Sequence, residues 1–454
     1  MQINISTQPI TFLVHTRKEE ILYMNNYKGK KLLFIGATAY ACDFIKLAKE
    51  QGIYTIVTDY NPNAPAKKIT DKCYDVSTLD HDAVYKTAIE NNVDAVAVGW
   101  SDINLTTAHA ICEKLNLPFY ATKEQIAATI NKRTFKRLCV ESGVPIVQEY
   151  SLDVDFKEND LAKIKYPVIV KPVDNGASKG VYICKDKNEL KEKYVKAFEY
   201  SYCKDVLVER FMPNGMVFLY YTIQDGYISL SAMMDKYVQE ELPGIIPHFT
   251  AFIFPSKYLD GRYLEFHKKM HKMLQRLNFH NGTLFLETYI DNDGNMYAGE
   301  MGFRPSGARE YKIISQENGI NTLQMYLNHA MTGIFSGWDI KEKDNPYFKH
   351  MYAVLVMVLG SGTITKIEGI DEIQASPGVF DFMQLRNIGD KISAIGTADE
   401  YFARVYITAD NAESLAERIT HVQRILKVFD ESGNNMLLKS FNTEMLLRDY
   451  VGKS

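Results

Sequence analysis

The sequence predicts an α/β domain with a parallel sheet near the N-terminus, followed by α+β units built on antiparallel sheets. From Lys31 onward, apolar runs such as KLLFIG and YTIVTDY alternate with helix-spaced segments, a pattern that favours a parallel, doubly wound sheet. After about residue 125, Asn-Gly and Asp-Gly pairs stand between alternating apolar runs and mark hairpins. We therefore predict an extension at 1–29, an α/β domain at 30–125, α+β segments at 126–345 and a smaller α+β domain at 346–454.

The first domain takes its strands from KLLFIG, YTIVTDY, VDAVAVGW and LPFYA, with helix-spaced segments between them. The turn after the first strand has one glycine, Gly36, where a dinucleotide fingerprint has three. We interpret this domain as a doubly wound sheet without a dinucleotide, although Asp59 could contact a ribose. Ser101 and Asp102 follow a strand at its carboxyl end, where open α/β sheets bind ligands, and are candidate substrate contacts.

Composition and charge argue against several classes of function. A net charge of −4 with only scattered basic clusters indicates neither a nucleic acid nor a membrane as partner. The six cysteines form no CxxC pair, which disfavours a zinc site or a disulfide framework and fits a cytoplasmic protein. The apolar runs are too short to span a bilayer, and ITFLV is too short for a signal peptide. Met24, just before the first strong strand, is an alternative start.

Two glutamates are expected to face each other across a hairpin. If Asp293 and Gly294 form a two-residue turn, Glu287 lies directly opposite Glu300, with Cβ atoms about 5 Å apart. Like charges at that distance destabilise a sheet, so we expect a divalent metal with oxygen ligands, together with nearby Arg304, to compensate them. A solvated pair of strand glutamates is the alternative. The opposite face of the hairpin carries a core-facing set: Leu284, Leu286, Ile290, Tyr297, Met301 and Phe303.

A lysine and a glycine-rich loop form the second candidate site. Lys171 lies mid-strand between apolar neighbours, where it costs desolvation unless it meets an anion. The loop at 174–180 follows, and its backbone N–H groups and the Ser178 hydroxyl can surround phosphate oxygens. It is not a Walker loop, because GxxxxGK[ST] is absent, and a plain hairpin turn is the alternative. Glu209, in VERF, could read an adenine at a strand end, or could be an exposed strand-end glutamate.

Together, and in this order, these residues resemble the ATP-grasp superfamily over about residues 30–450. INK at 130–132 is similar to the first ATP lysine of that family, IVKP with GASKGV to its second lysine and mobile lid, and VERF to its adenine hinge. EMGFRPSG is similar to the segment that holds a metal glutamate and the arginine that steadies the transferring phosphoryl group. The chain looks like the carbamoyl-phosphate synthetase large subunit-like, biotin carboxylase-like and L-amino-acid-ligase-like members.

The resemblance implies a division of the chain and a set of site residues. Residues 30–125 would be the pre-ATP-grasp domain, 126–201 the small lid subdomain, 202–345 the large subdomain with the metal site, and 346–454 the C-terminal domain. The implied residues are catalytic Lys132, Lys171 and Arg304; ligands of Mg²⁺ or Mn²⁺ at Glu287 and Glu300; and ATP contacts at Lys132, Lys171, Asn175, Gly176, Ala177, Ser178, Gly180, Glu209, Arg210 and Phe211.

Two positions depart from the pattern of the family. Gly302 stands where an asparagine usually supplies a third metal ligand, and Val217 stands where a glutamate usually binds the ribose. These departures put the strength of metal and ribose binding in doubt. His248, His280, Lys236 and Tyr237 could also face a substrate, although structural packing is the favoured interpretation of each.

The activity that the resemblance implies is ATP-dependent ligation. A substrate carboxylate would attack the γ-phosphate to give an acyl phosphate and ADP, and an amine or similar nucleophile would then displace phosphate. The alternatives are a bicarbonate-phosphorylating enzyme of carboxylase or carbamoyl-phosphate type, and an ATP-binding protein that has lost turnover. Small-molecule carboxylates and amines are the expected partners, and a homodimer is expected because related enzymes are often dimers.

Overall fold

The computed structural model describes residues 27–152, 154–175, 179–212, 215–238, 248–261, 263–393, 398–438 and 441–451. Met24 and nearly all of the expected extension lie outside these residues, as do Gly176, Ala177 and Ser178 of the glycine-rich loop. Within the described part of the chain, no helix combines the length and the apolar character needed to cross a membrane.

The N-terminal domain is built on a parallel sheet, as predicted, with four strands in the order β3-β2-β1-β4. The strand expected at LPFYA is wrong, because residues 117–121 form no strand, and the fourth strand is β3, which pairs with β2. Its strands are apolar along most of their length because helices cover both faces. Asp59 accepts hydrogen bonds from the backbone N–H groups of Ala37 and Asn61, so its carboxylate holds the turn after β1. The elements are β1 (Lys31–Ile35), α2 (Ala41–Glu50), β2 (Tyr54–Thr58), η1 (Pro65–Lys68), β3 (Lys72–Tyr74), α3 (His81–Asn91), β4 (Ala95–Val98) and α4 (Asp102–Leu115).

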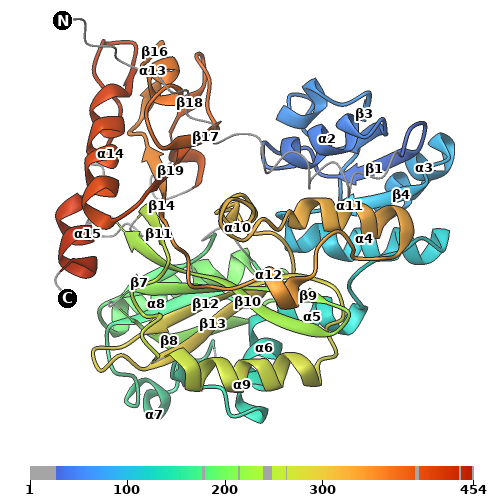
Figure 1. Ribbon diagram of the computed structural model, residues 1–454. Helices are drawn as coiled ribbons and strands as arrows, with labels where there is room; N and C mark the ends of the chain where they lie inside the picture. The colour runs from blue at the N-terminus through green and yellow to red at the C-terminus, as the bar shows by residue number, and fades with distance from the viewer. Residues whose placement is uncertain are drawn as a thin grey trace, which may run out of the picture.

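An eight-stranded antiparallel sheet forms the centre of the molecule, in the order β13-β12-β9-β10-β11-β14-β19-β17. Strand β14 pairs with β11, so the sheet continues across the predicted boundary at 346, which stays a prediction. Figure 1 shows the N-terminal domain (blue) and the C-terminal segment (red) on either side of α10. The strands are β9 (Met216–Gln224), β10 (Tyr227–Val238), β11 (Phe249–Phe254), β12 (Gly282–Ile290), β13 (Met296–Gly302), β14 (Met351–Val358), β17 (Val379–Gln384) and β19 (Tyr401–Ala409).

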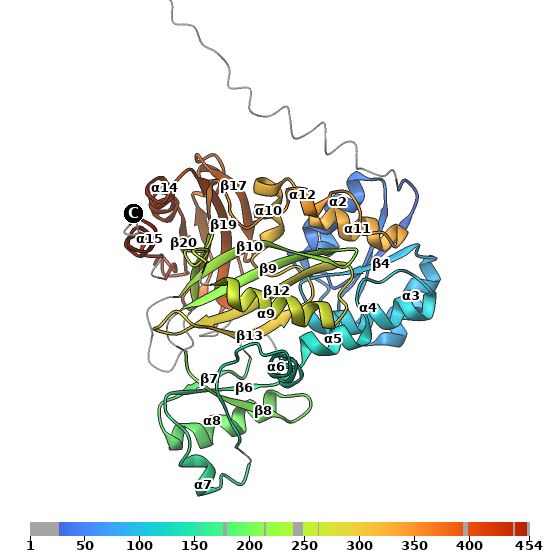
Figure 2. The ribbon, with the colours of Figure 1, turned by 60° about the horizontal axis from the view of Figure 1, so that its bottom comes forward.

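A small sheet in the order β5-β8-β6-β7 projects beneath β12 and β13, next to helix α6 (Figure 2). Strand β8 pairs with β6, although it follows the predicted boundary between the two subdomains at 201/202. The hydrophobic core of this sheet is separate from the cores of the central sheet. Its elements are β5 (Glu149–Tyr150), α7 (Glu158–Leu161), β6 (Val168–Pro172), β7 (Tyr182–Cys184), α8 (Lys187–Tyr200) and β8 (Val206–Arg210), and α6 spans Lys132–Glu141.

The two faces of the central sheet pack into different cores. On one face a single core joins the sheet to α2, α10 and α11. On the other face one core joins it to α5, α6 and α9, and another joins β11, β14 and β19 to α14. The remaining elements are α5 (Lys123–Ile130), α9 (Tyr263–Arg276), α10 (Glu310–Asn318), α11 (Thr322–Thr332), α12 (Ile340–Lys343), β15 (Gly362–Thr363), β16 (Lys366–Glu368), α13 (Ile370–Gln374), β18 (Lys391–Ile392), η2 (Ala398–Glu400), α14 (Ala412–Ile425), β20 (Lys427–Phe429) and α15 (Thr443–Tyr450).

Candidate nucleotide and metal site

The hairpin β12–β13 places Glu287 directly opposite Glu300, as the sequence predicts. The turn, however, differs from the two-residue turn that led to this prediction. Strand pairing stops at Ile290 and Met296, which leaves a five-residue loop, and the register shifts between Glu287 and Thr288 because Gly299 forms a bulge. The five-residue loop shifts the pairing by one residue relative to a two-residue turn, and the extra residue at the bulge shifts it back. The two glutamates therefore still pair.

The bulge also changes which side chains enter the core. Tyr297 was expected to face the core, but it is only half-buried and donates a hydrogen bond to Asp291 at 2.9 Å. Met296 and Ala298 are buried in its place. The expectation for Tyr297 was therefore wrong, because a bulge moves every residue beyond it to the other face.

Buried charge surrounds the two glutamates. The side chain of Glu287 is 11% exposed and that of Glu300 is 41% exposed. Burial raises the pKa of Glu287 above its ordinary value; Lys236 opposes this increase and Glu300 adds to it. Burial would also raise the pKa of Glu300, but Lys132 and Lys171 outweigh it and hold that pKa below its ordinary value.

Two lysines from different elements form ion pairs with these glutamates, and Lys171 acts on them electrostatically from farther away. Lys132, at the start of α6, has its Nζ 3.4 Å from Glu300 Oε2 and donates a hydrogen bond to the Asn175 carbonyl at 2.7 Å. Lys236, on β10, has its Nζ 3.6 Å from Glu287 Oε1. The sequence favoured a packing role for Lys236. The structure instead places it beside Glu287, a candidate metal ligand.

Two carboxylates that face each other across a strand pair fit a divalent cation. Oxygen ligands are what Mg²⁺ and Mn²⁺ prefer, and a phosphate-bound Mg²⁺ needs only one or two protein carboxylates. Among the residues that the structure describes, no three histidine, cysteine, aspartate or glutamate side chains gather to hold a metal by themselves. The site therefore suits an ion whose other ligands come from a nucleotide and water.

Arg304 forms an ion pair with a residue outside the hairpin, Asp102. Its Nε and Nη2 atoms bond to the two carboxylate oxygens of Asp102, at 2.8 Å and 2.5 Å, and its guanidinium lies over the Phe285 ring. Asp102 begins α4 in the N-terminal domain, so this ion pair joins that domain to the metal hairpin. Arg304 also interacts electrostatically with Glu300, so its expected part in compensating the two glutamates stays a prediction, alongside that of the lysines.

A second buried cluster lies where β6, β8 and α6 meet. Glu209 is 2% exposed and forms ion pairs with Lys171, at 2.6 Å, and with Lys136 of α6. Burial would raise the pKa of Glu209 and lower that of Lys171, but their mutual attraction reverses both shifts. The alternative of an exposed strand-end glutamate is therefore wrong, while Arg210 beside it is exposed and Phe211 is half-buried.

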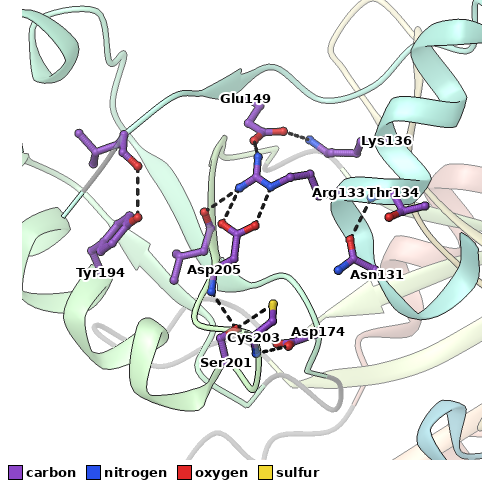
Figure 3. Close-up of polar contacts among 12 residues, drawn as sticks. Asn131, Arg133, Thr134, Lys136, Glu149, Asp174, Tyr194, Ser201, Cys203 and Asp205 are labelled. Atoms are coloured by element: carbon purple, nitrogen blue, oxygen red, sulfur yellow. Dashed lines mark hydrogen bonds and ion pairs between the residues drawn. The ribbon is translucent and has the colours of Figure 1, made fainter. Parts of the chain in front are cut away.

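The base of the glycine-rich loop is held by hydrogen bonds (Figure 3). Asp174 accepts bonds from Ser201 Oγ at 2.8 Å and from the backbone N–H of Tyr202 and Cys203. Close by, Arg133 of α6 bonds to both oxygens of Asp205. These contacts fix the N-terminal end of a loop whose residues 176–178 lie outside the described part of the chain.

Replacing Asp174 with alanine is expected to loosen this base. Each lost hydrogen bond to a charged acceptor is worth about 1.5–3 kcal/mol, so amide exchange at Tyr202 and Cys203 should become about 10-fold faster or more. Hydrogen exchange followed by mass spectrometry measures this, with Asp82→Asn, whose side chain is 95% exposed, as control. Unchanged exchange at both amides would contradict the anchoring role.

The structure explains the two departures from the family pattern. A Cβ atom added to Gly302 would lie 2.3 Å from the Phe285 ring, which pairs with Gly302 across the hairpin. Phe285 therefore fills the space that an asparagine side chain would need. Val217 is 1% exposed and packs in the core, so its side chain is not at the site.

This contact predicts that Gly302→Asn will not supply a third metal ligand. Overpacking of this kind costs about 1–3 kcal/mol, so the single variant should lose stability and bind Mn²⁺ no better than the parent. Phe285→Ala combined with Gly302→Asn should recover part of the stability, as measured by urea unfolding. Tighter Mn²⁺ binding by the single variant would show that Phe285 does not block the position.

Comparisons with known proteins identify the architecture. Residues 143–233 match the family model for the C-terminus of D-ala D-ala ligase, and residues 355–429 match that for L-amino acid ligase C-terminal domain 2. The formate-dependent phosphoribosylglycinamide formyltransferase of Francisella tularensis subsp. tularensis (strain WY96-3418) is 29% identical over 205 residues, covering 41% of this chain and 49% of the relative. The chain thus spans about half the length of that curated relative.

Two solved structures share the arrangement of the elements. The L-amino acid ligase from Bacillus licheniformis has a TM-score of 0.73 at 21% identity, covering 89% of this chain and 99% of its own. The biotin carboxylase domain dimer of the Hydrogenobacter thermophilus 2-oxoglutarate carboxylase, in complex with MgADP, ADP and bicarbonate, has a TM-score of 0.69 at 19% identity, covering 88% and 90%. The predicted mixture of one parallel and several antiparallel sheets, and the predicted resemblance, are confirmed.

Proposed function

We propose that this chain, which has the ATP-grasp fold, is an ATP-dependent ligase that activates a carboxylate and joins it to an amine or a similar nucleophile. The observation that carries the proposal is the pairing of Glu287 with Glu300, approached by Lys132 from α6 and lying near Lys171 of the small sheet. Two acids and two lysines from three parts of the fold suit a nucleotide triphosphate with its metal ion.

The first step would transfer the γ-phosphoryl group. A carboxylate oxygen of the substrate attacks the γ-phosphorus, the bond to the bridging oxygen breaks, and ADP leaves with the electron pair. Lys132 and Lys171 would donate hydrogen bonds to phosphate oxygens, and Arg304, held in plane by Asp102, would steady the moving group. Glu287 and Glu300 would hold Mg²⁺ or Mn²⁺, which neutralises charge on the phosphate oxygens when bound.

The second step would form the new bond. The amine nitrogen attacks the acyl carbon of the acyl phosphate. The carbon–oxygen bond to phosphate breaks, and phosphate leaves with the electron pair. The amine loses a proton to the departing phosphate or to water. The remaining proposed nucleotide contacts are Asn175, Gly176, Ala177, Ser178, Gly180, Glu209, Arg210 and Phe211. For Glu209 the role would be indirect, since its carboxylate is already bound by Lys171 and Lys136.

A substrate screen tests the proposal. The protein is incubated with ATP and Mg²⁺ against pools of carboxylates and amines, and the released nucleotide is identified as ADP or AMP. We expect ADP and phosphate with a particular pair of pools. ADP release that needs only bicarbonate would favour a carboxylase-type reaction, and ATP binding without turnover in any pool would overturn the ligase proposal.

Three properties belong to the same proposal. The partners are small molecules, the protein is cytoplasmic, and it forms a homodimer. The dimer is supported by the relative whose biotin carboxylase domain is described as a dimer. Light scattering at micromolar concentration measures it, and a monomer at all concentrations would contradict it.

A further inference from the structure

Arg404 is a buried cation without an acidic partner among the described residues. It lies on β19, it is 4% exposed, and its Nε and Nη1 atoms have no hydrogen-bond acceptor. Nearby Arg309 is also 4% exposed, but it is paired with Asp43 and with Asp381. Of these two arginines on one side of the sheet, only Arg404 lacks a counter-charge in the described structure.

Aromatic rings do not account for the burial of this charge. The guanidinium of Arg404 lies 5.8 Å from the centroid of Tyr40 and 5.5 Å from that of Phe252. Contacts with ring faces stabilise a cation by less than the cost of removing an unpaired charge from water. A buried guanidinium whose Nε and Nη1 atoms have no acceptor therefore indicates an anion that binds there.

The strand register places Arg404 on the same face of the central sheet as Glu287. Directly paired residues project to the same side of a sheet, as do residues two apart on one strand. Glu287 pairs with Phe218, which pairs with Met234, and Lys236 follows two residues later on β10. From there the row continues through Phe252 of β11, then Val354 and Val356 of β14, to Arg404.

The same row sets the separation between Arg404 and Lys236, the lysine that contacts Glu287; Glu287 itself is five strands from Arg404, or about 24 Å at the backbone. Lys236, which reaches Glu287, stands three strands from Arg404, or about 14 Å at the backbone. Both side chains are long, so one metabolite can contact the two. The loop after Arg304 lies next to Arg404, because a Cβ atom on Gly307 would lie 3.9 Å from Arg404 Nη2 and from the Tyr40 hydroxyl.

Charge balance indicates which anion fits. A single unpaired guanidinium matches a monoanion, whereas a phosphate dianion would need a second free cation, and Arg309 is already neutralised by two aspartates. We propose that Arg404 binds a substrate carboxylate that is not itself activated, at a subsite on the sheet face that also carries the metal-ligand glutamates. This inference rests on the proposed ligase function for the identity of the ligand as a substrate.

A binding experiment tests the subsite without any turnover. In protein labelled with [¹⁵N]arginine, the Arg404 Nε–H resonance is identified by its loss in Arg404→Gln. Sodium acetate is the probe, with acetamide as the neutral isostere and sodium chloride as the control for ionic strength. A saturable shift of this resonance with acetate alone is expected. No shift, an equal shift with acetamide, or a shift with inorganic phosphate but not acetate would overturn the proposal.

A kinetic experiment tests the same subsite in the working enzyme. For a substrate pair found in the screen, the amide analogue of the non-reacting carboxylate is compared with the acid. The wild type should prefer the acid by about 10- to 100-fold in kcat/KM, Arg404→Gln should lose that preference, and Arg404→Lys should keep part of it. Arg386→Gln, an arginine that pairs with exposed Asp399, is the matched control.

Two controls distinguish a misfolded variant, a failure of the proposed function and a failure of the proposed subsite. Stabilisation of Arg404→Gln by MgADP in a thermal scan, equal to that of the wild type, shows that the variant is folded with an intact nucleotide site. If the wild type releases no ADP in any pool, the proposed function fails and the acetate titration still decides the subsite. If turnover is present and Arg404→Gln keeps the full preference for the acid, the subsite fails and the function stands.

Discussion

Replacing Glu300 with glutamine is expected to lower ADP release by about 100-fold or more while the protein stays folded. Even residues that only orient a metal ligand are worth 10- to 100-fold in affinity or activity, and Glu300 would be a ligand itself. The amide keeps the shape of the side chain, but it removes the negative charge that pairs with Lys132 and that faces Glu287 across the hairpin. Initial rates at saturating ATP and Mg²⁺ measure the effect.

The matched control for this variant is Glu368→Gln. Glu368 is an exposed glutamate of β16 that pairs with Lys366, far in sequence from the site. Its replacement should leave the rate within about two-fold, because exposed ion pairs contribute little. A Glu300→Gln protein that retains most of the wild-type rate would remove Glu300 from the metal site.

Replacing Glu209 with glutamine is expected to cost about 3–5 kcal/mol in the free energy of unfolding of the ligand-free protein. The carboxylate is the counter-charge for both Lys136 and Lys171, and breaking a buried ion pair leaves uncompensated charge in the interior. Urea unfolding followed by circular dichroism measures the loss. Glu199→Gln, an exposed glutamate of α8, is the control and should change stability by less than about 0.5 kcal/mol.

A double variant separates charge from packing at this cluster. Adding Lys136→Met to Glu209→Gln removes one of the two stranded lysine charges, so part of the lost stability should return. The phosphates of ATP should also restore stability to Glu209→Gln through Lys171. A Glu209→Gln protein as stable as the parent would show that the cluster carries little net energy.

The sequence predicts the layers of this fold because strand and hairpin signals are local. Alternating apolar runs and the Asp-Gly pair locate β12 and β13, and their face pattern places Glu287 opposite Glu300. The correct pairing nevertheless came from the wrong turn, since the five-residue loop and the bulge at Gly299 offset each other. No local signal in the sequence distinguishes that combination from a two-residue turn.

The partners of the charged side chains could not be predicted in the same way. Arg304 meets Asp102, which is 202 residues away, and Glu209 meets Lys136 from a helix of another segment. Lys236 and Arg404 reach the site face only because β10 and β19 join one sheet with β12. These contacts depend on the order of strands, which a single sequence does not specify, and they are where the structure adds most to the site.

The central claim is that a carboxylate receives the γ-phosphoryl group of ATP. Its most direct test uses the active carboxylate from the screen, labelled with ¹⁸O in its carboxyl group, and follows the released phosphate by ³¹P NMR or mass spectrometry. The account predicts ADP together with phosphate that carries one ¹⁸O atom from the carboxylate. AMP as product, or phosphate without ¹⁸O, would contradict it.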